Sequence, residues 1–176
     1  PCHASVEVGA HTAAIDGALE LDDGLTQQQA QLLVRTMVIA RSQSVDRFFW
    51  WRFYDTLGAG LGILRNQDYD YMPKPAVVSY AVMQRQLAGA SQVQLMENQP
   101  NAGIFVSKVS FADKSDRHVI WTINDADSIQ LQCTDPITVT DIMGVQQSVT
   151  PTDGSVLLPI SQSPVYIQSA SSVDVL

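Results

Sequence analysis

The sequence predicts a chain in two parts, an α/β segment up to about residue 90 and an all-β segment after it. Helical periodicity alternates with strand-like apolar runs in the first part. Short β-rich segments separated by turn residues fill the second part. At 176 residues the chain is long enough for two small domains, which we expect at 1–90 and 91–176.

The first part begins with a strand candidate, Ala4–Val8, and a long loop rich in Gly, Ala and Asp. A helix is expected to open at Thr26, where Thr26 and Gln29 fit the capping-box pattern. Its apolar face should comprise Ala30, Leu33, Val34, Met37 and Val38.

A second strand and a second helix complete this part. The aromatic density of Val45–Trp51 favours a strand. After a loop, Pro75 is suited to the first turn of a helix and Gly89 to the position just past its end. The inner face of this helix is expected to contain Val77, Tyr80, Ala81 and Leu87.

The order strand, helix, strand, helix implies parallel strands joined by crossover helices. Two parallel strands cannot make a stable sheet alone, because both faces and both edges need cover. We therefore expect further strands before Pro1, which makes the chain a fragment of a longer protein.

The second part contains about eight short strand candidates, consistent with a small antiparallel β-sandwich. Asp153-Gly154 is a hairpin-turn candidate, and 169–176 is expected to be a frayed end. The strand candidates are Gln92–Met96, Gly103–Phe111, His118–Ile123, Ile129–Cys133, Ile137–Ile142, Gln146–Thr150, Ser155–Ile160 and Val165–Gln168.

The overall charge argues against two classes of partner, nucleic acids and anionic membranes, and does not identify another. The net charge is -8, and nucleic-acid backbones and anionic membranes both need a basic face. Cys2 and Cys133 are the only cysteines and predict two isolated thiols. The sequence contains no metal-ligand spacing and no phosphate-binding glycine loop, so we expect no metal and no cofactor.

Glu7 is the candidate catalytic residue because apolar residues flank it on a short strand and Gly9 follows. Burying an ionised carboxylate in a parallel strand costs free energy, so such a residue is expected to have a function. Barrel enzymes keep their catalytic groups at the carboxyl ends of their strands. A surface glutamate on a strand is the alternative interpretation.

Trp50, Trp51, Asp55 and His11 are candidates for substrate binding. A tryptophan face stacks on the C–H face of a sugar, and its N–H can bond a hydroxyl. His11 follows the first strand, in a loop that would approach a substrate. The alternatives are plain core aromatic residues and an ordinary loop histidine.

Taken in order, these pieces resemble clan A glycoside hydrolases, nearest the family 39 type. The motif 5–9 is similar to the family's nucleophile strand and Phe49-Trp50-Trp51 to its eighth strand. Pro73-Lys74-Pro75-Ala76 and Pro164-Val165-Tyr166-Ile167 match later motifs. Val6 departs from the family's usual threonine.

The resemblance implies the last two βα units of a (β/α)8 barrel, a C-terminal β-sandwich and a retaining mechanism. Glu7 would be the nucleophile, and the acid/base would lie on a barrel strand before Pro1, in the missing N-terminal barrel segment. Trp50 would floor a bound sugar, with Trp51, His11 and Asp55 lining it. It also implies a carbohydrate substrate and favours a secreted or cell-envelope location.

Two other functions stay open. The first is a non-catalytic carbohydrate-binding protein on a decayed barrel. The second is a structural or interaction module centred on the β-rich part.

Overall fold

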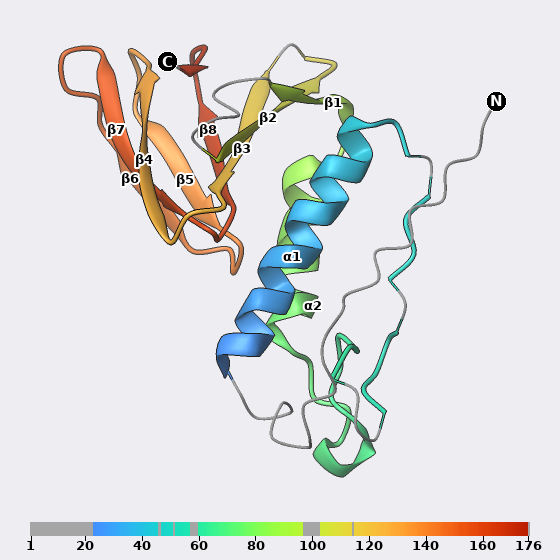
Figure 1. Cartoon of the computed structure of the whole chain (residues 1–176). Coiled ribbons are helices and arrows are strands. Elements are labelled where there is room, and N and C mark those ends of the chain that lie inside the picture. The colour runs from blue at the N-terminus through green and yellow to red at the C-terminus, as the bar shows by residue number, and fades with distance from the viewer. Residues whose placement is uncertain are drawn as a thin grey trace. The chain divides into compact units, whose positions relative to one another are not determined.

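The computed structural model describes residues 23–45, 47–50, 52–56, 60–96, 103–113 and 115–175. Two compact units make up the chain, Pro1–Ala81 and Val82–Leu176. The described residues form two α-helices and a set of antiparallel strands, which confirms the expected α/β content followed by β structure (Figure 1). The strand predicted at Ala4–Val8 lies outside the described residues.

Helix α1 (Asp23–Ser42) has the predicted apolar face but a different start. Ala30, Leu33, Val34 and Val38 are all buried, as their helical spacing predicts. The capping-box prediction is wrong, because the helix begins three residues before Thr26. Thr26 therefore lies inside the first turn, and the Gln29 amide is used elsewhere.

The strand predicted at Val45–Trp51 is not present in the described residues of this segment, 45, 47–50 and 52. A parallel strand needs hydrogen-bonded neighbours, and none of the described residues pairs with this stretch in a ladder. The chain is ordered just after it by isolated bridges, Tyr54 with Leu64 in parallel and Leu64 with Pro73 antiparallel. The short 3-10 helix η2 (Gln67–Tyr69) lies in the sequence between Leu64 and Pro73.

Helix α2 (Pro75–Leu87) begins at Pro75, as predicted, and Gly89 beyond its end has φ +76°. Its buried face differs from the predicted one. Tyr80 and Ala81 are exposed, while the buried positions are Ala76, Ser79, Met83 and Leu87. Ser79 can be buried because its hydroxyl donates to the Ala76 carbonyl at 3.0 Å, which satisfies it within the helix.

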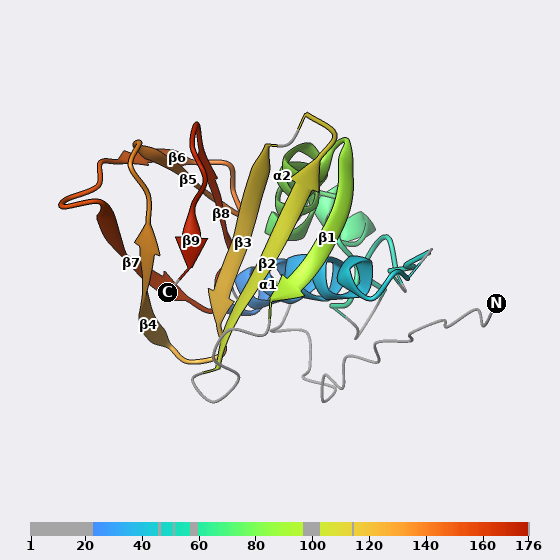
Figure 2. The ribbon, with the colours of Figure 1, turned by 90° about the horizontal axis from the view of Figure 1, so that it is seen from above.

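The second unit consists of two antiparallel sheets, and all eight predicted strands are present with shifted ends. The six-stranded sheet has the order β1-β2-β3-β8-β5-β6, and Figure 2 shows β1, β2 and β3 side by side. The three-stranded sheet has the order β7-β4-β9. The strands are β1 (Ala90–Met96), β2 (Ile104–Phe111), β3 (Asp116–Thr122), β4 (Ala126–Gln132), β5 (Ile137–Asp141), β6 (Gln146–Val149), β7 (Ser155–Ser161), β8 (Val165–Ser169) and β9 (Asp174–Val175).

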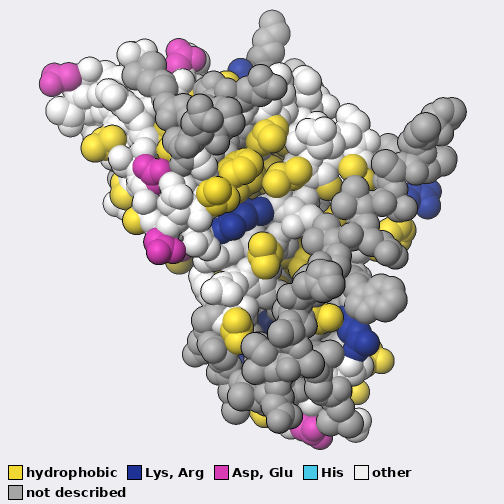
Figure 3. All heavy atoms as spheres, in the orientation of Figure 1, with side chains coloured by type: hydrophobic (Ala, Val, Ile, Leu, Met, Phe, Trp, Pro, Cys, Tyr) yellow, Lys and Arg dark blue, Asp and Glu magenta, His cyan; other side chains and the backbone are white. Residues whose placement is uncertain are grey.

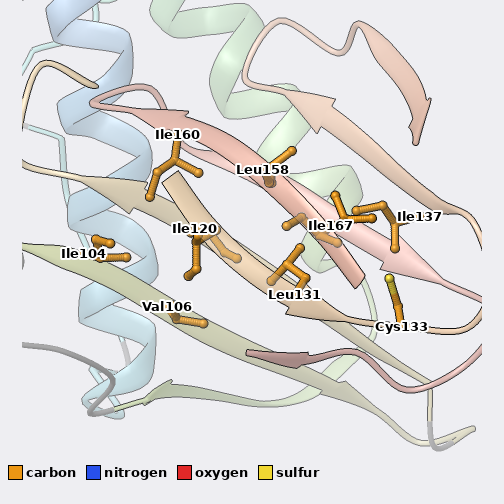
Figure 4. Packing of buried hydrophobic residues seen from close by; sticks show 11 residues of the cluster. Ile104, Val106, Ile120, Leu131, Cys133, Ile137, Leu158, Ile160 and Ile167 are labelled. Atoms are coloured by element: carbon orange, nitrogen blue, oxygen red, sulfur yellow. The ribbon is translucent and has the colours of Figure 1, made fainter. Parts of the chain in front are cut away.

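One hydrophobic core joins the two sheets (Figure 4). It combines Ile120 and Ile167 of the larger sheet with Leu131 and Leu158 of the smaller one. Cys133 is a free, buried thiol in the same cluster, and burial raises its pKa. Along β7 the buried residues Val156, Leu158 and Ile160 alternate with exposed ones, as expected for a strand with one face in a core.

The ends of the second unit refine two predictions. Asp153 and Gly154 both have positive φ and form a two-residue turn, closed by hydrogen bonds between Thr152 and Ser155. The turn does not join paired strands, since β6 and β7 lie in different sheets. The frayed-end prediction is wrong at β9, where Val175 pairs with Leu131 and extends the smaller sheet.

Candidate functional site

Two of the predicted site residues, Trp50 and Asp55, lie in the described part of the chain. Glu7, His11 and Trp51 lie outside it. The structure brings Trp50 and Asp55 to the same short segment, Gly60–Gly62, where Trp50 contacts the middle residue, Leu61, and Asp55 contacts Gly62. This segment is the organising feature of the first unit's candidate site.

All three carbonyl oxygens of Gly60–Gly62 accept hydrogen bonds from side chains. Lys74 Nζ donates to Gly60 O at 3.1 Å, and Trp50 Nε1 donates to Leu61 O at 3.1 Å. Gln29 Nε2 of α1 donates to both Leu61 O at 3.1 Å and Gly62 O at 3.0 Å. We call this arrangement the carbonyl clamp. It anchors a short loop to three distant points of the sequence.

Asp55 and Lys74 form a buried ion pair beside the clamp. The Nζ–Oδ2 distance is 2.6 Å, and both residues are only 2% exposed. The other carboxylate oxygen, Oδ1, accepts the Gly62 backbone N–H at 2.8 Å. Both ions are thus matched by partners, which a buried charge requires. Removing one member of such a pair costs about 3–5 kcal/mol.

Backbone pairing fixes the residues that carry the ion pair. The Asp55 N–H donates to Leu64 O at 3.0 Å, and the Lys74 N–H donates to Ile63 O at 3.0 Å. Pro73 pairs with Leu64, and Pro75 opens α2. The motif Pro73-Lys74-Pro75-Ala76 therefore places its lysine by means of a bridge on one side and a helix start on the other.

Gly62 is required by close packing. A Cβ at this position would lie 2.2 Å from the Tyr54 carbonyl carbon and 2.3 Å from the Asp55 nitrogen, closer than any real contact. Only glycine lets the two backbone segments approach this closely. The same approach lets the Gly62 N–H reach Asp55.

Trp50 is half-buried, and its indole N–H is already engaged by Leu61 O. The expectation that this N–H could bond a sugar hydroxyl is therefore not met in this structure. The ring keeps some exposure, so it can offer an apolar face. Further along the chain Tyr54 and Tyr71 are exposed and meet edge to face, with ring centroids 5.9 Å apart.

Sequence reasoning missed Lys74, Gln29 and Gly62 as parts of the site. In the sequence, Lys74 stands within a family-like motif and Gln29 fits a helix-cap pattern. A lysine between two prolines, after a loop containing Gly60 and Gly62, was the available signal. Its partner, 19 positions earlier, leaves no local pattern.

A second polar region lies within the second unit. A cavity of about 140 Å³ is lined by His118 and Asp116 at the start of β3 and by the segment 169–173. Asp116 pairs with Lys108 at 2.8 Å. Burial, and then the charge of Lys108, lower the pKa of His118 against the opposing effects of Asp116 and Asp174. His118 is therefore neutral at neutral pH.

The described residues hold no group of three or more His, Cys, Asp or Glu side chains able to bind a metal ion. On the face shown in Figure 3 the acidic side chains stand singly. No helix in the described ranges is long and apolar enough to cross a membrane.

Comparison with known proteins finds a likeness of fold. No protein-family profile matches the chain, and no curated protein matches its sequence. Solved structures do match. A family 39 glycoside hydrolase from the gut symbiont Bacteroides cellulosilyticus WH2 matches with TM-score 0.64 and 21% identity over 82% of this chain.

The chain has a glycosidase-like fold. The catalytic domain of GH30 xylanase C from Talaromyces cellulolyticus also matches, with TM-score 0.54 and 14% identity over 80% of the chain. The chain spans 30% of the Bacteroides hydrolase and 35% of the xylanase. At these identities the likeness concerns the fold.

Proposed function

We propose that this chain is the C-terminal part of a retaining glycoside hydrolase. Residues 1–90 would be the end of a (β/α)8 barrel, and 91–176 a C-terminal β-sandwich. The observation that carries the proposal is the fold likeness to a family 39 glycoside hydrolase over 82% of the chain. The order of the sequence motifs also supports it, because that order resembles the one in family 39 glycoside hydrolases.

The proposed mechanism is a double displacement. A Glu7 carboxylate oxygen forms a bond to the anomeric carbon while the bond to the leaving oxygen breaks, and a second carboxyl gives that oxygen its proton. Water then attacks the same carbon, its proton goes to the second carboxylate, and the bond to Glu7 breaks. In retaining enzymes the two carboxyl groups lie about 5–5.5 Å apart. The second group would come from barrel segments before Pro1.

Trp50 is proposed as the floor of the sugar site. Its N–H is held by Leu61 O, so the ring face is the part left for stacking on a sugar. Trp51 and His11 remain proposed lining residues. Asp55 is buried with its carboxylate engaged by Lys74 and Gly62, so we assign its contribution to shaping the site.

Turnover by the complete protein that carries this chain tests the proposal. Oligosaccharides of xylose and glucose, each six units long, serve as substrates, and NMR follows the anomeric configuration of the first product. We expect retention, and a loss of kcat/KM of about 10³-fold or more in Glu7→Gln. Glu97→Gln makes the same chemical change elsewhere and should keep full activity.

Four results would speak against the proposal. Inversion of configuration would exclude a glycosyl-enzyme at Glu7. Equal turnover in Glu7→Gln and wild type would remove the nucleophile assignment. Oligosaccharide binding without turnover would favour a carbohydrate-binding protein. Hydrolysis by residues 1–176 alone would show that the second carboxyl lies within this chain.

A further inference from the structure

Lys74 contacts Asp55, one of the predicted sugar-binding residues, and the loop segment that accepts the indole N–H of another, Trp50. Its Nζ contacts both Asp55 Oδ2, at 2.6 Å, and Gly60 O, at 3.1 Å. Asp55 in turn accepts the Gly62 N–H at 2.8 Å. The ion pair therefore fixes both ends of the Gly60–Gly62 segment.

The carbonyl between those two ends is the one that Trp50 uses. The indole N–H is the only polar group of a tryptophan side chain, and for Trp50 the acceptor is Leu61 O at 3.1 Å. Gln29 Nε2 donates to the same oxygen at 3.1 Å. The position of this carbonyl consequently determines where the Trp50 N–H is satisfied and how the ring is turned.

We propose that Lys74 is a positioning residue, which acts with Asp55 to present Leu61 O to Trp50 Nε1 and so sets the orientation of the Trp50 ring. The inference rests on the proposed function only in assigning that ring to a sugar. A buried ion pair is weak evidence for stability alone, because well-packed apolar residues often serve equally well. The geometry of this pair points to a further role. Asp55 accepts the backbone N–H of Gly62, seven residues later, and Lys74 donates to the backbone carbonyl of Gly60, fourteen residues earlier.

The indole N–H of Trp50 provides a readout that needs no sugar. Its ¹⁵N–¹H resonance and its rate of hydrogen exchange report directly on the bond to Leu61 O. In the wild-type chain we expect exchange at least tenfold slower than for free tryptophan. Trp121, which is 1% exposed within the second unit, supplies an internal reference for folding.

Lys74→Met removes the charge and keeps an unbranched side chain that is one atom shorter. We expect a shifted Trp50 resonance and at least tenfold faster exchange, with Trp121 unchanged. Lys108→Met is the matched control, because Lys108 is also paired with an aspartate but is 40% exposed and lies in the second unit. That variant should leave Trp50 as in the wild type.

The double variant Asp55→Asn/Lys74→Met addresses the case in which Lys74→Met alone unfolds the first unit. It leaves no unpaired charge in the buried site and should loosen Trp50 in the same way. A wild-type Trp50 resonance and exchange rate in either folded variant would overturn the proposal. Exchange in the wild-type chain as fast as in free tryptophan would overturn it without any variant.

A kinetic measurement on the complete protein separates this inference from the proposed function. With six-unit xylose oligosaccharides, Lys74→Met should raise KM about tenfold and change kcat less than threefold, because a misplaced floor weakens binding throughout. Trp50→Ala should do the same. Unchanged kinetics in Trp50→Ala would reject the sugar-floor role, while the indole measurements would still decide the role of Lys74.

Discussion

At Gly62 two backbone segments lie so close that the absence of a single atom decides the local structure. The carbonyl carbon of Tyr54 is 2.2 Å from the point where a Cβ would stand. Because the neighbours are backbone atoms, they cannot move aside as a flexible side chain would. The ion pair, the carbonyl clamp and the Trp50 contact all depend on this approach.

We therefore predict that Gly62→Ala lowers the free energy of unfolding of the first unit by about 3 kcal/mol or more, the upper range for overpacking. Denaturant unfolding monitored by Trp50 indole signals measures it. Gly89→Ala, in the second unit and followed by Trp121 fluorescence, is the comparison: Gly89 has φ +76° but open space around it, so only conformational strain of about 1–2 kcal/mol is expected. Equal losses in the two variants would show that close packing at Gly62 is unimportant.

His118 gives the second unit a predictable response to pH. Its pKa in the folded chain lies below the ordinary value of 6.5, first because of burial and then because of Lys108. As the pH falls through about 6.5 the unfolded chain takes up a proton that the folded chain does not. The contribution of His118 to stability is thus fully present above that pH and is lost below it.

We predict that the free energy of unfolding of the second unit falls between pH 7.5 and pH 5.5 and that His118→Gln flattens this dependence. Denaturant unfolding followed by Trp121 fluorescence across that range measures both. The same slope in the variant and the wild type would show that another group causes the dependence.

At the scale of elements, the strands of the second unit were the most predictable part of the chain. Turn residues separate them at regular intervals, and alternation along strands such as β4 and β7 marks one buried face. The face of α2 was predicted wrongly, because Ser79 satisfies its hydroxyl inside the helix and takes a buried position. The polar side chain of Ser79 had instead suggested an exposed position.

Alternation along these strands predicts the cost of truncating a leucine. Leu131 of β4 is fully buried in the shared core, so Leu131→Ala should cost about 2–5 kcal/mol. Leu157 of β7 is 70% exposed, so the same substitution there should change stability by no more than about 0.5 kcal/mol. Chemical denaturation compares the two. A similar cost at both positions would contradict the shared core.

At the scale of the whole molecule, the sequence predicted an α/β part followed by a β part, and the structure confirms that content. The aromatic residues of Val45–Trp51 were not enough to predict a strand, because a parallel strand forms only where neighbouring strands hydrogen-bond to it. The sequence did not predict the carbonyl clamp either. Its donors lie near positions 29, 50 and 74, and only the fold brings them to one loop.

Covalent trapping of the nucleophile tests the central claim, that this chain contributes Glu7 to a retaining glycoside hydrolase. The complete protein would be treated with 2-deoxy-2-fluoro xylosyl and glucosyl fluorides, and its peptides analysed by mass spectrometry. We predict one fluorosugar on Glu7 and none in Glu7→Gln. A fluorosugar on a different carboxylate, or oligosaccharide turnover with inversion and no label, would contradict it.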